Sequence, residues 1–572
     1  MKKILSCTRK YLPFIILTPI IIMVEVLLEV NIPLIMGKIV DYGIPSNELG
    51  TVLKLGGNMV ITAFLSLMCG ALASIFAANG SIGFGSELRK EVFNRILNFS
   101  FENVDSFQQS SLLTRLTTDV RFIQMGLRMT MVMAVRAPFM MIAAATVAYG
   151  INRDLFIVFI IAAPILITAI VILGRKAMPL FRYMLTKYDG LNDRAKEYLT
   201  NVRVVKSFVR EDYEIEKFKE INHELMTSSI KVESLLVLIS PLMMLVIYAT
   251  IIAILWLGGN QIMIGTMRTG ELISFISYVG QILAGLLMLA MIFLNMVRLK
   301  GSVDRINEVL NTESSIVDGD YEGTLEDGSI QFDNVTFRYE SSSKDAIINA
   351  DLYIRSGETV GIVGSTGSGK TSLVQLIPRL YDVTSGSVIV GKHDVRDYRL
   401  ADLRKEVAMV LQQNVLFSGT IKENLLWGNE NATDEEIIEA CKVANAHDFI
   451  MSFPEGYTTN LGQGGVNLSG GQKQRICIAR ALLAKPKIII LDDSTSAVDT
   501  QTDSAIRLAL KEQLKDTTTI IIAQRVASVM DADRVVVIDN GEIIDVDTPE
   551  NLLRTSEIYK DIYYTQMEGV EL

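Results

Sequence analysis

Residues 360–371 read VGIVGSTGSGKT, a short run of mostly apolar residues that passes directly into a glycine-rich loop. The segment 364–371 matches the phosphate-loop pattern G-x-x-x-x-G-K-[ST], and it lies between a predicted strand and a predicted helix, as that pattern requires. The glycines let main-chain N–H groups surround the phosphates of a nucleotide, and the start of the helix adds a favourable dipole. We expect Lys370 to reach the β- and γ-phosphates of ATP and Thr371 to hold Mg²⁺.

A second buried strand is predicted at 488–492, where the sequence IIILD runs from four apolar residues into an aspartate. A carboxylate at the end of such a strand is suited to hold Mg²⁺ through water, so we expect Asp492 to act together with Thr371. Short β-branched strands alternate with helical segments from about residue 330 onward, which is typical of an α/β domain.

The composition separates this C-terminal part from the rest of the chain. The 572 residues are 49% hydrophobic and only 21% charged, and the mean hydropathy is +0.33. The apolar runs concentrate before about residue 300, which excludes a purely cytosolic enzyme and a purely membrane-embedded protein. The net charge of −10 argues against nucleic acid as the main partner. The four cysteines have no metal-like spacing and predict neither a disulfide framework nor a zinc site.

Six apolar stretches are long enough to cross a lipid bilayer, which takes about 20 helical residues. They lie near 12–35, 56–78, 131–150, 155–174, 234–257 and 271–297. Most basic residues of this half lie at the N-terminus and in two long segments, 79–130 and 175–231. By the positive-inside rule, both termini and both long segments are cytoplasmic, with the chain in the cell membrane. Helical periodicity in these segments predicts helices that continue far beyond the bilayer.

Three charged residues inside the predicted spans need a partner or a wet cavity, because each costs a few kcal/mol in lipid. Glu25 and Glu29 lie four residues apart and share one face of the first span, and Arg136 lies in the third. One hypothesis is a cavity that recognises cationic or amphipathic substrates. The other is a structural Glu–Arg pair between helices.

A pentapeptide between the phosphate loop and Asp492 indicates a family. Residues 468–472 read LSGGQ, and together with the phosphate loop they resemble the signature of the nucleotide-binding domain of ABC transporters. The resemblance implies that Tyr339 stacks on adenine, that Gln412 is the Q-loop glutamine contacting Mg²⁺, and that the D-loop includes Ser496 and Asp499. It also implies that each ATP site forms across a dimer, with the signature of one chain facing the Walker motifs of the other.

These expectations define the candidate site. The residues expected to bind ATP are Tyr339, Gly364, Ser365, Thr366, Gly367, Ser368, Gly369, Lys370, Thr371, Ser372 and Gln412. Those expected to act on the nucleotide of a partner chain are Leu468, Ser469, Gly470, Gly471 and Gln472. Those expected to hold Mg²⁺ are Thr371, Gln412 and Asp492.

Six spans ahead of one ATPase domain resemble the exporter branch of the family. We expect an α-helical six-span membrane domain over 1–311 with cytoplasmic helical extensions, a linker over 312–329, and an α/β P-loop ABC ATPase domain over 330–572. Segments 110–119 and 201–208 resemble the coupling segments that touch the ATPase. One domain of each kind makes half a transporter, so the working unit is expected to be a dimer.

The sequence departs from the family pattern at two positions of the ATP site. Asp492 stands at the position of the Walker B aspartate. The residue after that aspartate is normally a glutamate, which acts as general base, and here it is Asp493. A carboxylate that is one methylene shorter lies more than about 1 Å away, and a misplacement of that size can cost about 10²-fold in rate. The switch histidine is replaced by Gln524, and the three histidines of the chain, His223, His393 and His447, all lie upstream.

Both losses beside intact phosphate-loop and signature motifs predict a site that binds ATP and hydrolyses it poorly. This combination resembles the degenerate-site subunit of bacterial heterodimeric multidrug ABC exporters. It implies a partner half-transporter that carries the catalytic glutamate and the switch histidine, and small amphipathic compounds as substrates. Two alternatives stay open: a lipid or peptide exporter driven by the same ATPase mechanism, and an ATP-gated regulatory or channel-like membrane protein.

Overall fold

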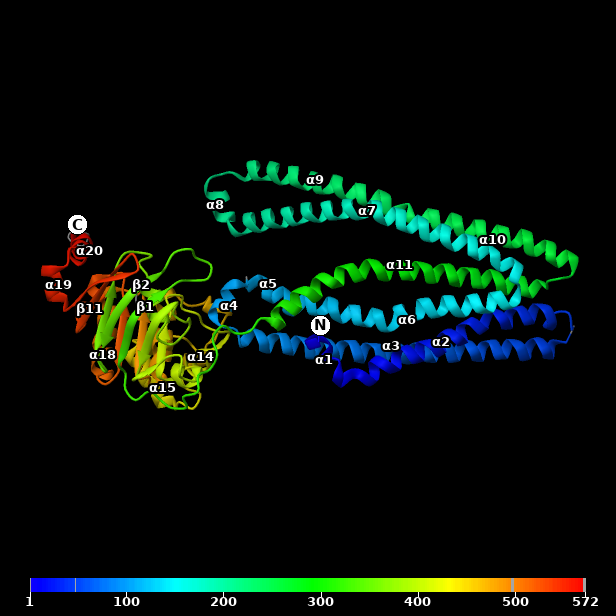
Figure 1. Ribbon diagram of the computed structural model, residues 1–572. Coiled ribbons are helices and arrows are strands. Elements are labelled where there is room, and N and C mark those ends of the chain that lie inside the picture. Colours follow the sequence, from blue (N-terminus) through cyan, green and yellow to red (C-terminus); the bar gives the residue numbers. More distant parts are fainter. Residues whose placement is uncertain (1, 47, 108, 495–497, 569–572) are drawn as a thin grey trace. The chain divides into compact units, whose positions relative to one another are not determined.

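The computed structural model describes residues 2–46, 48–107, 109–494 and 498–568 (Figure 1). By their internal contacts they divide into two compact units. The helical unit comprises Met1–Arg95 and Ser110–Asn311, and the α/β unit comprises Ile96–Gln109 and Thr312–Leu572. The short segment 96–109 therefore groups with the α/β unit, although in sequence it lies between two long helices of the other.

The helical unit is built from long apolar helices. Its elements are α1 (Lys2–Ser6), η1 (Arg9–Tyr11), α2 (Leu12–Lys38), η2 (Ile39–Gly43), α3 (Leu49–Leu97), α5 (Gln109–Thr114), η3 (Arg115–Asp119), α6 (Val120–Ile151), α7 (Arg153–Thr200), α8 (Val202–Ser207), α9 (Glu211–Val237), α10 (Ile239–Ile264) and α11 (Thr269–Asn311). Among the described residues, six segments are long and apolar enough to cross a membrane, which confirms the prediction: Arg9–Gly43, Leu49–Leu97, Ser110–Ile151, Arg153–Thr200, Glu211–Ile264 and Thr269–Leu289.

Several of these helices are much longer than a membrane span. Helix α3 has 49 residues and α7 has 48, whereas a bilayer takes about 20. The predicted helical extensions beyond the bilayer are therefore present. Helices α7 and α9 lie side by side in the extended part (Figure 1).

The core of the helical unit is held by hydrogen bonds as well as apolar packing. On α11, the fully buried Tyr278 donates from its hydroxyl to the carbonyl of Val30 on α2 at 2.6 Å. One turn earlier, Ser274 donates to the carbonyl of Pro33 at 2.7 Å. Such bonds between neighbouring helices fix their register where apolar contacts alone would let them slide.

The α/β unit alternates strands and helices as predicted. Its elements are α4 (Phe101–Ser106), β1 (Ile330–Phe337), β2 (Ile347–Ile354), β3 (Thr359–Val363), α12 (Lys370–Gln375), β4 (Ser385–Val390), β5 (His393–Asp394), α13 (Leu400–Glu406), β6 (Val407–Val410), β7 (Gly419–Thr420), α14 (Ile421–Leu425), α15 (Asp434–Val443), α16 (His447–Met451), η4 (Gly456–Thr458), β8 (Asn460–Leu461), η5 (Gln463–Gly465), α17 (Gly470–Leu483), β9 (Ile488–Asp492), α18 (Thr500–Gln513), β10 (Thr518–Ile522), η6 (Val526–Ser528), β11 (Arg534–Asp539), β12 (Glu542–Asp547), α19 (Pro549–Thr555) and α20 (Glu557–Glu568).

Two sheets organise this unit. A six-stranded sheet has the order β12-β11-β3-β10-β9-β6, and a four-stranded sheet has the order β2-β1-β4-β5. In the first, β11, β3, β10, β9 and β6 run parallel to one another, and β12 pairs antiparallel with β11 at the edge. Every residue of β9 is buried. Burial on both faces explains why 488–491 is an uninterrupted apolar run and not an alternating one.

Candidate functional site

Three parallel strands end at one edge of the six-stranded sheet and bring the predicted phosphate-binding residues together. Strand β10 lies between β3 and β9, and Ile522 pairs with Ile362 on one side and with Asp492 on the other. Because parallel strands share one direction, the residues that follow these three positions meet at the carboxyl edge, where α/β folds bind ligands. A cavity of about 420 Å³ lies there, lined by the phosphate loop, Gln412, Asp492, Asp493 and Gln524.

The phosphate loop has the conformation that its glycines permit. Gly369 has φ +101° immediately before α12, and a Cβ there would lie 2.5 Å from the carbonyl oxygen of Ala346. Lys370 folds over the loop and donates from Nζ to the carbonyls of Gly364 at 2.9 Å and Ser365 at 2.7 Å. Burial lowers the pKa of Lys370, against the opposing effect of nearby carboxylates. A partly desolvated ammonium at this position is electrostatically suited to bind a phosphate.

Thr371 and Asp492 form the predicted Mg²⁺ pair. The hydroxyl of Thr371 donates to Asp492, with Oγ1 3.0 Å from Oδ2 and 3.2 Å from Oδ1. Asp492 is 2% exposed, and burial raises its pKa although the Thr371 hydrogen bond opposes the change. Among the described residues no three His, Cys, Asp or Glu side chains gather as a metal site. Hard oxygen ligands from two side chains nevertheless fit Mg²⁺, which keeps waters and binds substrate phosphates as its other ligands.

The two residues that depart from the family pattern contact each other. Gln524 donates from Nε2 to Oδ2 of Asp493 at 3.0 Å. The backbone of Asp493 has φ +48°, a left-handed conformation that is uncommon for a residue with a side chain. Its N–H donates to the carbonyl of Ile522 at 3.0 Å, which joins the end of β9 to the end of β10. The side chains at positions 493 and 524 are therefore structurally coupled, so a change at one position alters the surroundings of the other.

One wall of the cavity was not predicted from the sequence. It is formed by Asp561, Ile562, Thr565 and Gln566, all on the C-terminal helix α20. These residues belong to no nucleotide-binding motif, and the only sequence signal of this segment is its amphipathic helical pattern. The fold alone brings α20 to the site.

Tyr339, the predicted adenine-stacking residue, lies at a second cavity of about 480 Å³. Its hydroxyl hydrogen-bonds to Ser372 Oγ at 2.9 Å, and its ring packs edge-on against Tyr381 with centroids 5.2 Å apart. Tyr381 in turn donates to Asp105 of α4 at 2.6 Å. Burial raises the pKa of Tyr381, and so does Asp105 as its hydrogen-bond acceptor, so the hydroxyl remains a donor at physiological pH. A continuous chain of contacts thus runs from α12 through both tyrosines to α4.

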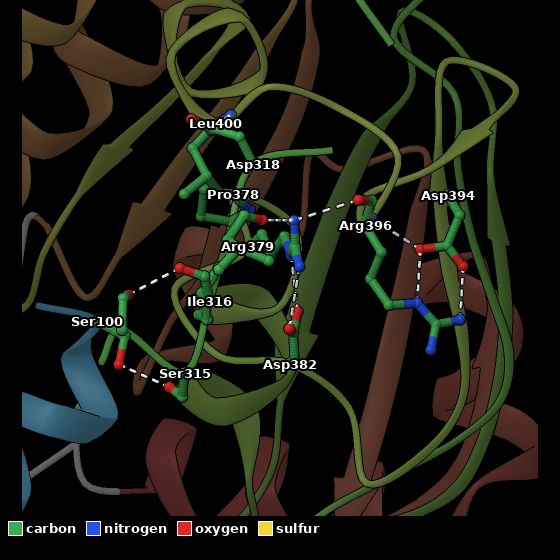
Figure 2. Close-up of polar contacts among 12 residues, drawn as sticks. Ser100, Ser315, Ile316, Asp318, Pro378, Arg379, Asp382, Asp394, Arg396 and Leu400 are labelled. Carbon is green, nitrogen blue, oxygen red and sulfur yellow. Dashed lines mark hydrogen bonds and ion pairs between the residues drawn. The ribbon is translucent and has the colours of Figure 1, made fainter. Parts of the chain in front are cut away.

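The predicted linker, 312–329, is bound along the surface of the α/β unit. Arg379 is 4% exposed and donates to the carbonyl of Val317 at 2.9 Å and to both carboxylate oxygens of Asp382 (Figure 2). Figure 2 also shows Ser315 beside Ser100, whose hydroxyls lie 2.7 Å apart. These contacts hold the segment that follows α11 next to α4.

The signature residues lie outside the cavity lined by this chain's Walker motifs. Ser469 caps α17: its hydroxyl accepts from Gln472 N at 3.3 Å, while Gln472 Oε1 accepts from Ser469 N at 2.9 Å. Leu468 is buried, whereas Ser469, Gly470 and the start of the helix stay near the surface. In the predicted D-loop, Asp499 caps α18 and accepts from Thr502 N at 2.9 Å; Ser496 lies outside the described residues.

In the helical unit, Arg136 of α6 binds both glutamates of α2. Its Nη1 lies 2.8 Å from Glu25 Oε1, and its Nη2 lies 2.6 Å from Glu29 Oε2. Glu25 is 8% exposed and packs beside Gly70 of α3, where a Cβ would lie 2.8 Å from Oε1. The three predicted residues therefore form one ion triad with a formal charge of −1.

Both predicted coupling segments belong to the helical unit. Residues 110–119 contact α11 there, where Asp119 accepts from Arg305. The second segment, 201–208, contains α8. The segment 96–109, which contains α4, groups with the α/β unit. The coupling role of 110–119 and 201–208 remains a prediction.

Comparisons with known proteins agree with this geometry. Residues 15–286 match the model of the ABC transporter transmembrane region, and residues 347–496 match that of the ABC transporter. The ABC transporter ATP-binding protein YfiB of Bacillus subtilis (strain 168) is 38% identical over 576 residues, covering 100% of both chains. An ATP-dependent lipid A-core flippase of Syntrophus aciditrophicus (strain SB) is 34% identical over 478 residues, 83% of this chain and 79% of the flippase.

The fold is also that of a solved relative. A structure of a bacterial Atm1-family ABC exporter with ATP bound matches with a TM-score of 0.82 at 24% identity, covering 98% of each chain. At this identity the likeness concerns the fold, six apolar helices followed by an ATPase domain with a mixed sheet. Full-length similarity to YfiB, two matching family models and this shared fold together show that the chain belongs to the ABC transporter family, as a multi-pass, ATP-hydrolysing transporter with the fold of an ABC exporter.

Proposed function

We propose that this chain is one half of a heterodimeric exporter and that its own Walker motifs form a degenerate site, which binds ATP and hydrolyses it slowly. The observation that carries the proposal is the hydrogen bond between Gln524 and Asp493 at the edge of β9 and β10. A shortened carboxylate that already accepts a hydrogen bond from an amide is poorly placed to polarise an attacking water.

The described lining of the cavity includes one more carboxylate, Asp561, but neither residue type of the family pattern. Among the described residues, the lining of the 420 Å³ cavity contains no glutamate and no histidine. The carboxamide of Gln524 does not titrate near neutral pH, so it cannot exchange a proton as an imidazole does. Asp492, Thr371 and Lys370 are intact, which supports binding of ATP together with Mg²⁺.

The signature supports a catalytic role toward a partner. Residues 468–472 keep the LSGGQ sequence, and Ser469 caps the N-terminus of α17. In the family arrangement this motif completes the site of the other chain. The proposed partner is a second half-transporter with a glutamate after its Walker B aspartate and a switch histidine. An ATP-gated channel-like protein, the alternative from a different class, would leave the intact signature without a catalytic function.

The proposed substrates are small amphipathic compounds. The similarity to a protein named as an ATP-dependent lipid A-core flippase, which by its name acts on a lipid, supports this class. It also supports a lipid as the specific alternative to a drug. We place the chain in the cell membrane with both termini and the ATPase domain in the cytoplasm, on the strength of the basic segments near the spans.

For Glu25, Glu29 and Arg136 we propose a structural role. Both carboxylates are bound by the same guanidinium, and this pairing is the arrangement that charged groups need in a membrane interior. The triad joins α2 to α6 near α3. Its net charge of −1 leaves it available as a secondary attraction for cationic substrates.

The experiment that tests the proposed function starts from the complex purified gently from native membranes through a tag on this chain. Mass spectrometry should identify a second ABC half-transporter in one-to-one ratio, with glutamate after its Walker B aspartate. Vesicles containing that complex should then export amphipathic dyes in an ATP-dependent manner, and labelled lipids as competitors distinguish the lipid alternative. Recovery of this chain as a homodimer would contradict the proposal and favour the ATP-gated alternative.

A further inference from the structure

The C-terminal helix α20 makes a two-point contact with the loop that carries Gln524. The side-chain amide of Gln566 donates from Nε2 to the carbonyl of Gln524 at 2.7 Å and accepts, at Oε1, from the N–H of Val526 at 2.8 Å. One carboxamide thus pairs with the main chain of two residues that flank Arg525, in the way that a neighbouring β-strand would. Such a pair of bonds restrains the direction of the loop and not only its distance.

The helix that supplies this side chain is itself firmly seated. Tyr559 of α20 is fully buried in an apolar cluster that includes Ala523 and Val526. Ala523 directly precedes the bonded loop, and Val526 is its last residue. Ile562, one turn further along α20, packs against the same cluster and lines the phosphate cavity. Gln566 therefore extends from a fixed base, so its amide can hold the loop in place.

The restrained loop leads directly to the phosphate site. Gln566 holds the backbone of Gln524, the Gln524 side chain donates to Asp493 at 3.0 Å, and Asp493 follows the Mg²⁺ residue Asp492. These four residues lie at the end of β9, just after β9, just after β10 and on α20. Their sequence separation reaches 74 residues, from 492 to 566. We propose that Gln566 is a positioning residue of this chain's nucleotide site. It sets the switch loop, residues 524–526, in the orientation that receives the terminal phosphate of ATP.

The inference rests on the proposed function only in that this chain's site binds ATP, and it does not depend on slow hydrolysis there. A homodimer would carry Gln566 at both sites and would show the same effect. Failure of the Gln566 proposal is therefore distinguishable from failure of the heterodimer proposal. The heterodimer proposal concerns the identity of the second chain.

Two variants of the purified complex test the role of Gln566. Gln566→Met keeps the length of the side chain and removes both hydrogen bonds. Gln566→Glu keeps the acceptor for Val526, but its ionised carboxylate faces the carbonyl of Gln524. When protonated, the same glutamate again donates one bond and accepts the other, so lowering the pH should restore the contact.

The readout is photoaffinity labelling with 8-azido-ATP in the cold, quantified separately on this chain and on any partner. We expect Gln566→Met to raise the concentration for half-labelling of this chain about 10-fold, the equivalent of about 1.4 kcal/mol. Gln566→Glu should behave like Gln566→Met at about pH 8 and approach the wild type, compared at each pH, as the pH falls to about 4.5, close to the ordinary glutamate pKa of about 4.3.

A matched control comes from the same helix. Lys560 donates from Nζ to the carbonyl of Arg554, so Lys560→Met also removes a side-chain to main-chain bond from α20 without touching the switch loop. It should label like the wild type. Unchanged half-labelling in Gln566→Met, or a Gln566→Glu defect that persists at low pH while Lys560→Met behaves as the wild type, would overturn the proposal.

Discussion

Gln524 donates a hydrogen bond to the carboxylate of Asp493 at 3.0 Å, across 31 residues of sequence. These are the two positions at which the sequence is interpreted as departing from the family pattern, and in the structure their side chains are in contact. Residues in direct contact do not respond independently to mutation. Restoring one family residue alone should therefore differ from restoring both.

The first prediction concerns this pair. Asp493→Glu with Gln524→His should raise ATP hydrolysis at this chain's site about 100-fold, because a longer carboxylate and a titratable imidazole return together. Asp493→Glu alone should give less than about a tenth of that gain, since the added methylene pushes the carboxylate into Gln524. Single-turnover hydrolysis by the purified complex measures both.

Adding Lys370→Ala to the double variant provides the control. Loss of the phosphate-binding ammonium should abolish the gain and so assign it to this chain. A wild-type site that already turns over as fast as the double variant would contradict the interpretation of positions 493 and 524.

A second prediction concerns Arg379, which holds the segment after α11. Arg379→Ala removes bonds to Asp382 and to the carbonyl of Val317 from a nearly fully buried position. We expect a loss of about 2–4 kcal/mol in the free energy of unfolding of the α/β unit. Hydrogen–deuterium exchange of peptides covering 314–320 should also become faster.

The matched control for Arg379 is Arg396→Ala. Arg396 also pairs with an aspartate, Asp394, but its side chain is 45% exposed (Figure 2). Exposed pairs contribute about 0–1 kcal/mol, so exchange at 314–320 should stay near the wild-type rate. Equal effects of the two variants would show that Arg379 has no special role in holding this segment.

A third prediction concerns the contact between Tyr381 and α4. Tyr381→Phe keeps the ring that packs on Tyr339 and removes the bond to Asp105, which measures 2.6 Å. If α4 is a coupling helix, the amount of substrate transported per ATP should fall about 2–5-fold while ATP binding is retained. A double-mutant cycle with Asp105→Asn should give a coupling energy of about 1 kcal/mol. Additive effects would show that the hydroxyl and the carboxylate act separately.

A fourth prediction concerns pH. Burial tends to raise the pKa of Glu358, but hydrogen bonds from Arg534 and from the N–H of Arg355 outweigh it and hold the pKa below its ordinary value. A lowered native pKa stabilises the fold above the unfolded-state pKa of about 4.3, and this contribution is lost as the pH falls through the native pKa. Glu358→Gln should therefore lower the apparent thermal midpoint by about 2–4 °C at pH 7 and by less near pH 4.

A matched comparison for this pH effect is Glu326→Gln. Glu326 is bound by Lys392 at 2.7 Å on the surface, where solvent screens the pair. Its replacement should leave the midpoint nearly unchanged at both pH values. A Glu358→Gln effect that grows as the pH falls would contradict the assigned sign.

Several features of this protein follow from local sequence. The phosphate loop, the buried strand that ends at Asp492 and the signature at 468–472 each depend on residues within a few positions of one another. A glycine with φ +101° before a helix, or a fully apolar strand before a carboxylate, can be recognised from a short pattern because its geometry is local. The six apolar segments were predictable for the same reason, since crossing a bilayer requires about 20 apolar residues in a row.

Other features were decided only by the tertiary structure. The contact of Gln524 with Asp493, the hydrogen bonds of Gln566 to the main chain of Gln524 and Val526, and the grouping of 96–109 with the α/β unit join residues far apart in sequence. No pattern encodes such contacts, because they depend on strand order, on where α20 packs, and on how a long helix ends. The sequence by itself determined the motif residues of the site, but not the residues of α20 that complete its lining. The parallel pairing of β3, β10 and β9 and the seating of α20 decided which of them touch, because hydrogen bonds depend on distances that only the assembled fold sets.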